Sequence, residues 1–227
     1  MKKVLLATAL SLCVSSAFAA GTAVMKVTGT LTNSACTPEL SNGGVVDYGI
    51  FRLGELSDTS TNALGQKDIN LTINCTVATK VGWSVSDDRK DSVAGIAITG
   101  GKTNGSNIST GEKYFLYGIG KTADGMKIGN YSLFVKDNKV TIDGVSGDVT
   151  GHNQDWSADT WRAAPSAVRS DSFLVVSAAN SGTTAPVAFK TAVFPLVTAL
   201  QIQDTATLGI TDDTSLDGQA TITLVYL

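Results

Sequence analysis

The sequence predicts an all-β protein, and three observations carry that prediction. Short segments alternate apolar and polar residues at the two-residue period of strands with one buried face. Turn signals containing glycine, asparagine or aspartate separate these segments. No stretch keeps a 3.6-residue apolar period over three helical turns or more. Because a sheet must bury its apolar face against another layer, we expect a two-sheet β-sandwich.

The expected strands follow one another along the chain. Each combines apolar alternation with bounding turn residues, and the chain contains only 4 prolines to interrupt them. In order, the expected strands are 24–31, 45–51, 69–75, 81–85, 96–98, 114–119, 131–135, 173–176, 187–197 and 220–227.

Segment 144–172 differs from the rest of the chain. It is polar and contains Trp156 and Trp161, so we expect a long loop or irregular insertion. Exposed indole rings edged by polar groups are typical of sugar-binding surfaces, which makes the two tryptophans a candidate ligand surface. The alternative is that both indoles lie under the loop and complete the core.

The N-terminus has the pattern of a secretory signal peptide over residues 1–19. A basic start is followed by an apolar run over 4–14 and by Ala17-Phe18-Ala19, which fits the small-x-small rule for cleavage. The apolar run is far shorter than the ~20 residues that a membrane helix needs, and no later segment comes closer. We therefore expect residues 20–227 to form a single exported domain without a membrane span, in the periplasm or at the cell surface.

Cleavage after Ala19 would leave two cysteines, Cys36 and Cys75. An even number of cysteines in an exported chain predicts a disulfide. A redox or metal site would favour a close C-x-x-C spacing, which is absent here. The formal net charge of −3 is mildly acidic, and it predicts no nucleic-acid partner.

Catalytic motifs are missing from the sequence. Its only histidine is His152, in the polar segment, and no Gly-x-Ser-x-Gly turn occurs. Two acidic clusters, 87–91 and 212–217, lack the spacing of a calcium loop. We therefore expect a protein that is not an enzyme and has no cofactor or metal site.

The C-terminal segment 219–227 predicts a strand that ends the chain. Its even-numbered apolar residues fall on one face, and threonines fall on the other. A terminal apolar strand is a ready partner for another chain unless something pairs with it. The candidate acceptor residues are Ala220, Ile222, Leu224 and Tyr226.

Three segments together resemble chaperone-usher pilin subunits: 25–36, which ends in Ala35-Cys36, then 71–75, and the final strand with its penultimate Tyr226. This resemblance implies an incomplete immunoglobulin-like sandwich, whose groove is filled first by a periplasmic pilus-type chaperone and then by the N-terminal segment of another fimbrial subunit. The donor segment here would present one face made of Ala23, Met25, Val27, Gly29 and Leu31.

A longer resemblance is to the GltF-like family of enterobacterial periplasmic proteins, whose domain type is uncharacterised. It rests on Ala35-Cys36-Thr37-Pro38, 44–49, 71–76, Asp88-Arg89, 125–129, Trp156-Ser157-Ala158, 193–196 and 216–222. We expect a fimbrial-type subunit, for a pilus or for adhesion, assembled by β-strand complementation. The alternative is a soluble periplasmic binding or regulatory protein with a self-completed sandwich, for which this family implies a link to nitrogen metabolism.

Overall fold

The computed structural model describes residues 35–136, 139–157, 160–163 and 165–227. The chain divides into two compact units, Met1–Asn33 and Ser34–Leu227, and the described residues belong to the second. The predicted signal peptide and the predicted donor residues Ala23, Met25, Val27, Gly29 and Leu31 lie outside the described residues.

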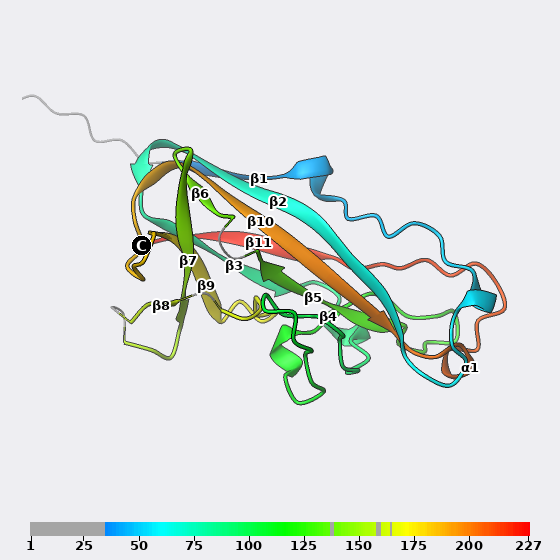
Figure 1. Ribbon diagram of the computed structural model, residues 1–227. Helices are drawn as coiled ribbons and strands as arrows, with labels where there is room; N and C mark the ends of the chain where they lie inside the picture. Colours follow the sequence, from blue (N-terminus) through cyan, green and yellow to red (C-terminus); the bar gives the residue numbers. More distant parts are fainter. Residues whose placement is uncertain (1–34, 137–138, 158–159, 164) are drawn as a thin grey trace, which may run out of the picture. The chain divides into compact units, whose positions relative to one another are not determined.

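The described part of the chain is almost entirely β-structure, as the alternation predicts (Figure 1). Its one α-helix, α1, is the single turn Thr205–Leu208, and its 3-10 turns are Ser41–Gly44, Leu53–Glu55, Lys90–Ser92 and Lys113–Phe115. The strands are β1 (Cys36–Leu40), β2 (Asn62–Thr79), β3 (Val81–Asp87), β4 (Tyr117–Gly118), β5 (Gly129–Val135), β6 (Thr141–Ile142), β7 (Val145–Asn153), β8 (Arg162–Ala163), β9 (Leu174–Asn180), β10 (Phe189–Ile202) and β11 (Ala220–Tyr226).

The strands form two layers joined at β7. One layer contains β1, β2, β10 and β5, in which the long strands β2 and β10 pair from Phe189↔Thr79 to Ile202↔Asn62. The other contains β9, β3 and β11, and β7 joins the layers because it pairs with β6 at its start and with β9 thereafter. Followed from strand to strand, the order is β1-β2-β10-β6-β7-β9-β3-β11. The strands β1 and β11 are therefore the two ends of this path.

The core lies between the layers. Trp83 of β3 and Phe194 of β10 are fully buried and meet edge to face, with ring centroids 5.6 Å apart. Leu71 and Ile73 of β2 and Val85 of β3 are also fully buried. Alternate residues of facing strands thus fill a common interior, which confirms the expected β-sandwich.

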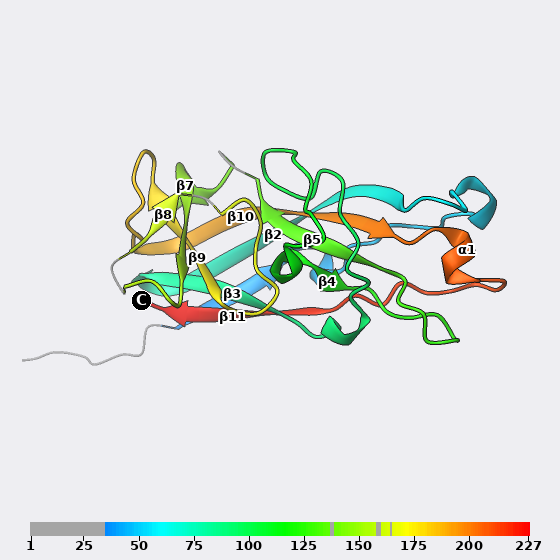
Figure 2. The same ribbon diagram turned by 90° about the horizontal axis from the view of Figure 1, so that it is seen from below.

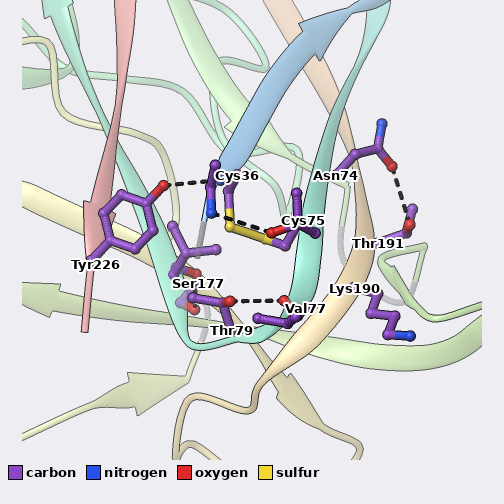
Figure 3. The surroundings of a disulfide bond; sticks show 12 residues. Cys36, Asn74, Cys75, Val77, Thr79, Ser177, Lys190, Thr191 and Tyr226 are labelled. Atoms are coloured by element: carbon purple, nitrogen blue, oxygen red, sulfur yellow. Dashed lines mark hydrogen bonds between the residues drawn. A yellow bond between two sulfur atoms is a disulfide. The ribbon is translucent and has the colours of Figure 1, made fainter. Parts of the chain in front are cut away.

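The disulfide between Cys36 and Cys75 confirms the sequence prediction. The two cysteines are directly opposed in the β1–β2 register, so the bond fastens β1 to its neighbour (Figure 3). The hydroxyl of Tyr226 accepts a hydrogen bond of 2.9 Å from the main-chain N–H of Cys36. That contact brings the last residues of β11 next to the first residue of β1 (Figure 3).

The irregular insertion expected over 144–172 is shorter than predicted. Its first part is the strand β7, and the described residues that follow contain only the two-residue β8 as regular structure before β9. Sequence reasoning missed this strand because small and polar residues occupy its buried positions. Thr150 is fully buried, and its hydroxyl donates to the carbonyls of Arg162 and Thr184. A Cβ on Gly147 would lie 2.4 Å from the side chain of Ile142, so the close packing there needs glycine.

Three other expected strands differ from the structure. Segment 45–51 belongs to no strand, and 96–98 contributes only an isolated bridge between Ile98 and Ile108. Segment 114–119 begins in a 3-10 turn and contains only the two-residue β4. In each case the alternation is present, but continuous main-chain pairing with a neighbouring strand is not.

Replacing Cys36 and Cys75 together by serine should lower the free energy of unfolding by about 4 kcal/mol, because the bond closes a long loop in the unfolded chain. Urea unfolding of the variant and of the wild type would measure the loss. Reduced wild-type protein is the matched control and should unfold like the variant. A loss below about 1 kcal/mol would contradict this role of the bond.

Candidate strand-binding groove

One edge of β11 is unpaired within the described part of the chain. β11 pairs with β3 from Ala220↔Asp87 to Tyr226↔Val81. Leu227 donates its N–H to the carbonyl of Lys80, so odd-numbered residues bond to β3, and the N–H and C=O groups of even-numbered residues face the other way. No described segment pairs with them there. This open edge offers main-chain donors and acceptors to an additional strand.

The four predicted acceptor residues are these even-numbered residues. Ala220, Ile222 and Leu224 are half-buried and pack against the main core, whereas Tyr226 is 54% exposed. The first three side chains therefore lie on the core face, and the threonines between them are exposed. Tyr226 is placed differently: its ring does not belong to the core, and its hydroxyl contacts the start of β1.

A second unpaired stretch of main chain is segment 45–51, after β1. Among the described residues, no main-chain hydrogen bond joins 46–51 to another segment. Tyr48 attaches this stretch to β10, because its hydroxyl donates to the carbonyl of Thr198 at 3.0 Å and lies 2.9 Å from the Thr198 hydroxyl. Burial of the Tyr48 ring raises its pKa to about 12. The neighbouring Ile50 is 97% exposed, so an apolar side chain is left without cover.

A groove of about 1070 Å³ lies between the two unpaired stretches. One wall comes from residues 40–56, and the other comes from 210–222 (the blue and red segments beside α1 in Figure 2). Its floor is formed by apolar side chains of β5 and β10, among them Leu133, Leu196 and Leu200. The volume is at the upper end of the range for ligand pockets, and main chain without partners lines both walls.

The groove is displaced from the acceptor edge that the sequence predicts. Ala220 and Ile222 line it, but Leu224 and Tyr226 do not, and it continues instead along 210–219. Sequence reasoning missed this part of the wall because 210–219 has little apolar alternation. The opposite wall did have a signal, since 45–51 shows the alternation of a strand.

Charged residues fix the turn that precedes β11. Arg89 donates from Nε and Nη2 to both carboxylate oxygens of Asp217, at 3.0 and 3.2 Å. Asp88 accepts a hydrogen bond from the Thr221 hydroxyl at 2.8 Å. The buried Asp87 accepts from the N–H groups of Arg89 and Gly118, and burial raises the pKa of its carboxyl. The carboxylates of these aspartates thus accept hydrogen bonds from main-chain and side-chain donors within the protein.

The two candidate ligand-binding tryptophans lie around His152, outside the main core. Trp156 meets the His152 ring edge to face, with ring centroids 6.2 Å apart, and Trp161 is tilted against it at 5.3 Å. Both indoles are half-buried. The guanidinium carbon of Arg162 lies 4.1 Å from the centroid of the Trp156 ring.

The described residues contain neither a metal-binding cluster nor a membrane-spanning helix. No group of three or more His, Cys, Asp and Glu side chains in this part of the chain is placed to hold a metal ion. No helix there has the length and hydropathy needed to cross a membrane.

Comparison with known proteins gives consistent matches. Residues 25–132 match the family described as "Protein of unknown function (DUF1120)". The uncharacterized protein YhcF of Escherichia coli strain K12 is 33% identical over 228 residues, which cover 93% of each chain. Protein GltF of the same strain is 29% identical over 242 residues, covering 96% of this chain and 94% of GltF. These matches confirm the resemblance to the GltF-like family.

Replacing Tyr48 by phenylalanine should lower the free energy of unfolding by about 1 kcal/mol, because the hydrogen bond to Thr198 is lost. The effect should depend on pH. The folded pKa of Tyr48, about 12, lies above its ordinary value of 10.0. The wild type therefore keeps the stability that the neutral Tyr48 hydroxyl contributes below pH 10.0, and it loses that stability as the pH rises toward 12. Urea unfolding at several pH values would test this: the gap between the two proteins should narrow in that window, and a constant gap would contradict it.

Proposed function

Because this chain belongs to the DUF1120 family and is similar over most of its length to YhcF and GltF, we propose its function from the groove. We propose a non-enzymatic, fimbrial-type subunit, for a pilus or for adhesion, that accepts a strand from another protein. The observation that carries the proposal is an apolar groove bordered by the open edge of β11. In β-strand addition, main-chain hydrogen bonds give affinity and alternate side chains filling pockets give specificity.

The main chain favours β11 over β1 as the accepting edge. Thr76 donates its N–H to the carbonyl of Ala35, so the odd-numbered residues of β1 bond to β2 and the even-numbered ones face outward. One of these is Pro38, which has no N–H to donate. The outward N–H of Cys36 is already bonded to Tyr226. β11 has neither restriction over its even-numbered residues, so an incoming strand gains more hydrogen bonds there.

The side chains of the groove favour an apolar, alternating partner strand. A strand laid beside β11 directs every second side chain toward the floor made by β5 and β10. The predicted donor segment has this pattern in its odd-numbered positions from Ala23 to Leu31. We infer that a periplasmic pilus-type chaperone fills the groove first and that another fimbrial subunit replaces it. The disulfide supports an oxidising compartment such as the periplasm.

Groove variants should separate strand binding from general stability. A synthetic peptide with the sequence of residues 20–34 should raise the thermal midpoint of the wild type, because a ligand that binds only the folded state stabilises it. Ile222→Asp should abolish the shift, since it places a charge on the groove wall. Thr223→Asp is the control, because Thr223 is an exposed neighbour on the opposite face of β11. Equal shifts in all three proteins would overturn the proposed site.

Expression in the periplasm provides a second test. The exported chain should accumulate in larger amounts when a cognate pilus-type chaperone is produced with it, and the two should purify as a complex. Covering an open strand edge removes the main route to aggregation. Stable, monomeric accumulation without the chaperone, with no effect of the peptide, would contradict the proposal and favour a binding or regulatory protein with a complete sandwich.

A further inference from the structure

A second, smaller cavity lies away from the groove and has a different chemistry. Its volume is about 240 Å³, and its lining comes from the 3-10 turn before β4, the end of β7, β8 and the segment that leads into β9. The lining includes Tyr114, Phe115, Asn153, Trp156, Arg162 and Arg169. Among the described residues that line it, the charged side chains are the two arginines, so this lining combines aromatic rings with positive charge.

Arg162 supplies a cation that has no ionic partner among the described residues. Its guanidinium carbon stacks 4.1 Å from the centroid of the Trp156 ring, and no carboxylate of the described residues pairs with it. A guanidinium is planar and carries its N–H donors around its rim. Stacking one face on the indole therefore leaves the rim free to donate a bidentate pair of hydrogen bonds to a carboxylate.

Arg169 is held rigidly on the other side of the cavity lining. Its guanidinium carbon lies 4.6 Å from the centroid of Tyr114 and 4.7 Å from that of Phe173. Its Nε donates to Asp171 at 2.9 Å, and its Nη2 donates to the other carboxylate oxygen of the same residue. Asp171 thus compensates the charge of Arg169 and fixes its orientation, while Nη1 has no bonded partner among the described residues. Among the described residues, Arg162 is the arginine of this lining that no carboxylate compensates.

The remaining lining suits a small hydroxylated ring. Asn153 contributes an amide, with both donor and acceptor atoms, and Ser166 contributes a hydroxyl. The aromatic rings of Tyr114 and Trp156 offer surfaces for apolar C–H groups. A cavity of about 240 Å³ is below the usual range for drug-sized ligands, so it suits one sugar ring better than a chain of several.

We propose that this cavity binds an acidic monosaccharide of the hexuronic acid type. The carboxylate meets the rim of the Arg162 guanidinium, the ring lies against the aromatic side chains, and Asn153 and Ser166 bond to hydroxyl groups. This inference is independent of the groove and of strand addition. A charged sugar is favoured over a neutral one because the described lining residues include two arginines and no carboxylate.

Calorimetric titration of the exported, oxidised protein with D-glucuronate tests the proposal. D-glucose has the same ring without the carboxylate, and acetate has the carboxylate without the ring. We expect D-glucuronate to bind at least about tenfold more tightly than either. Equal binding of D-glucuronate and D-glucose, equal binding of D-glucuronate and acetate, or no binding of D-glucuronate would each overturn the proposal.

Arginine variants locate the binding in this cavity. Arg162→Gln should weaken D-glucuronate binding about tenfold or more, and Arg162→Lys should recover only part of it, because lysine keeps the charge without the planar donor pair. Arg52→Gln is the matched control: it removes the same charge from an arginine whose side chain is 82% exposed and paired with Glu55. Thermal melting confirms that each variant is folded. Equal losses for Arg162→Gln and Arg52→Gln, or no loss for Arg162→Gln, would overturn the assignment.

Discussion

The hydrogen bonding of β11 is the constraint on which the rest of the structure depends. Buried or half-buried main-chain groups need partners, and β11 finds them on its β3 side alone within the described residues. The other end strand of the sheet path, β1, is fastened by the disulfide and by the contact between Cys36 and Tyr226 (Figure 3). The two edges are thus tied together at one end. Farther along, the apolar interior between the walls is left open as the groove.

In β11, the residues whose main-chain groups face the open edge are also the residues whose side chains face the core, which favours strand addition. The even-numbered residues direct their N–H and C=O groups to the open edge, and the side chains of Ala220, Ile222 and Leu224 toward the core. An added strand would therefore satisfy the main chain and cover the apolar floor at the same time. Segment 45–51, attached through Tyr48, provides the opposite wall with unpaired main chain of its own. One added strand would pair with both stretches of main chain.

Sequence patterns predicted the parts of this fold that follow from local alternation and from the cysteine count. The alternation in 220–227 and the two cysteines of the expected mature chain led directly to β11 and to the disulfide. β7 was missed because its buried positions are glycine, valine and threonine, whose hydroxyl is satisfied by distant carbonyls.

Segment 45–51 was predicted as a strand because alternation reports side-chain burial, not the presence of a pairing partner. The groove could not be located from sequence because its walls, 40–56 and 210–222, are far apart along the chain. The stacking of Arg162 on Trp156 depends on the turn between β7 and β8, and the alternation gives no information about it.

Residue-resolved amide hydrogen exchange would test the central claim most directly. In the isolated protein, the odd-numbered amides of β11 should be protected by β3, while the even-numbered amides should exchange faster. Addition of the chaperone or of the 20–34 peptide should slow exchange at the even-numbered amides and leave the odd-numbered ones little changed. Equal protection of both sets in the isolated protein would show that the edge is already paired, and it would contradict the account.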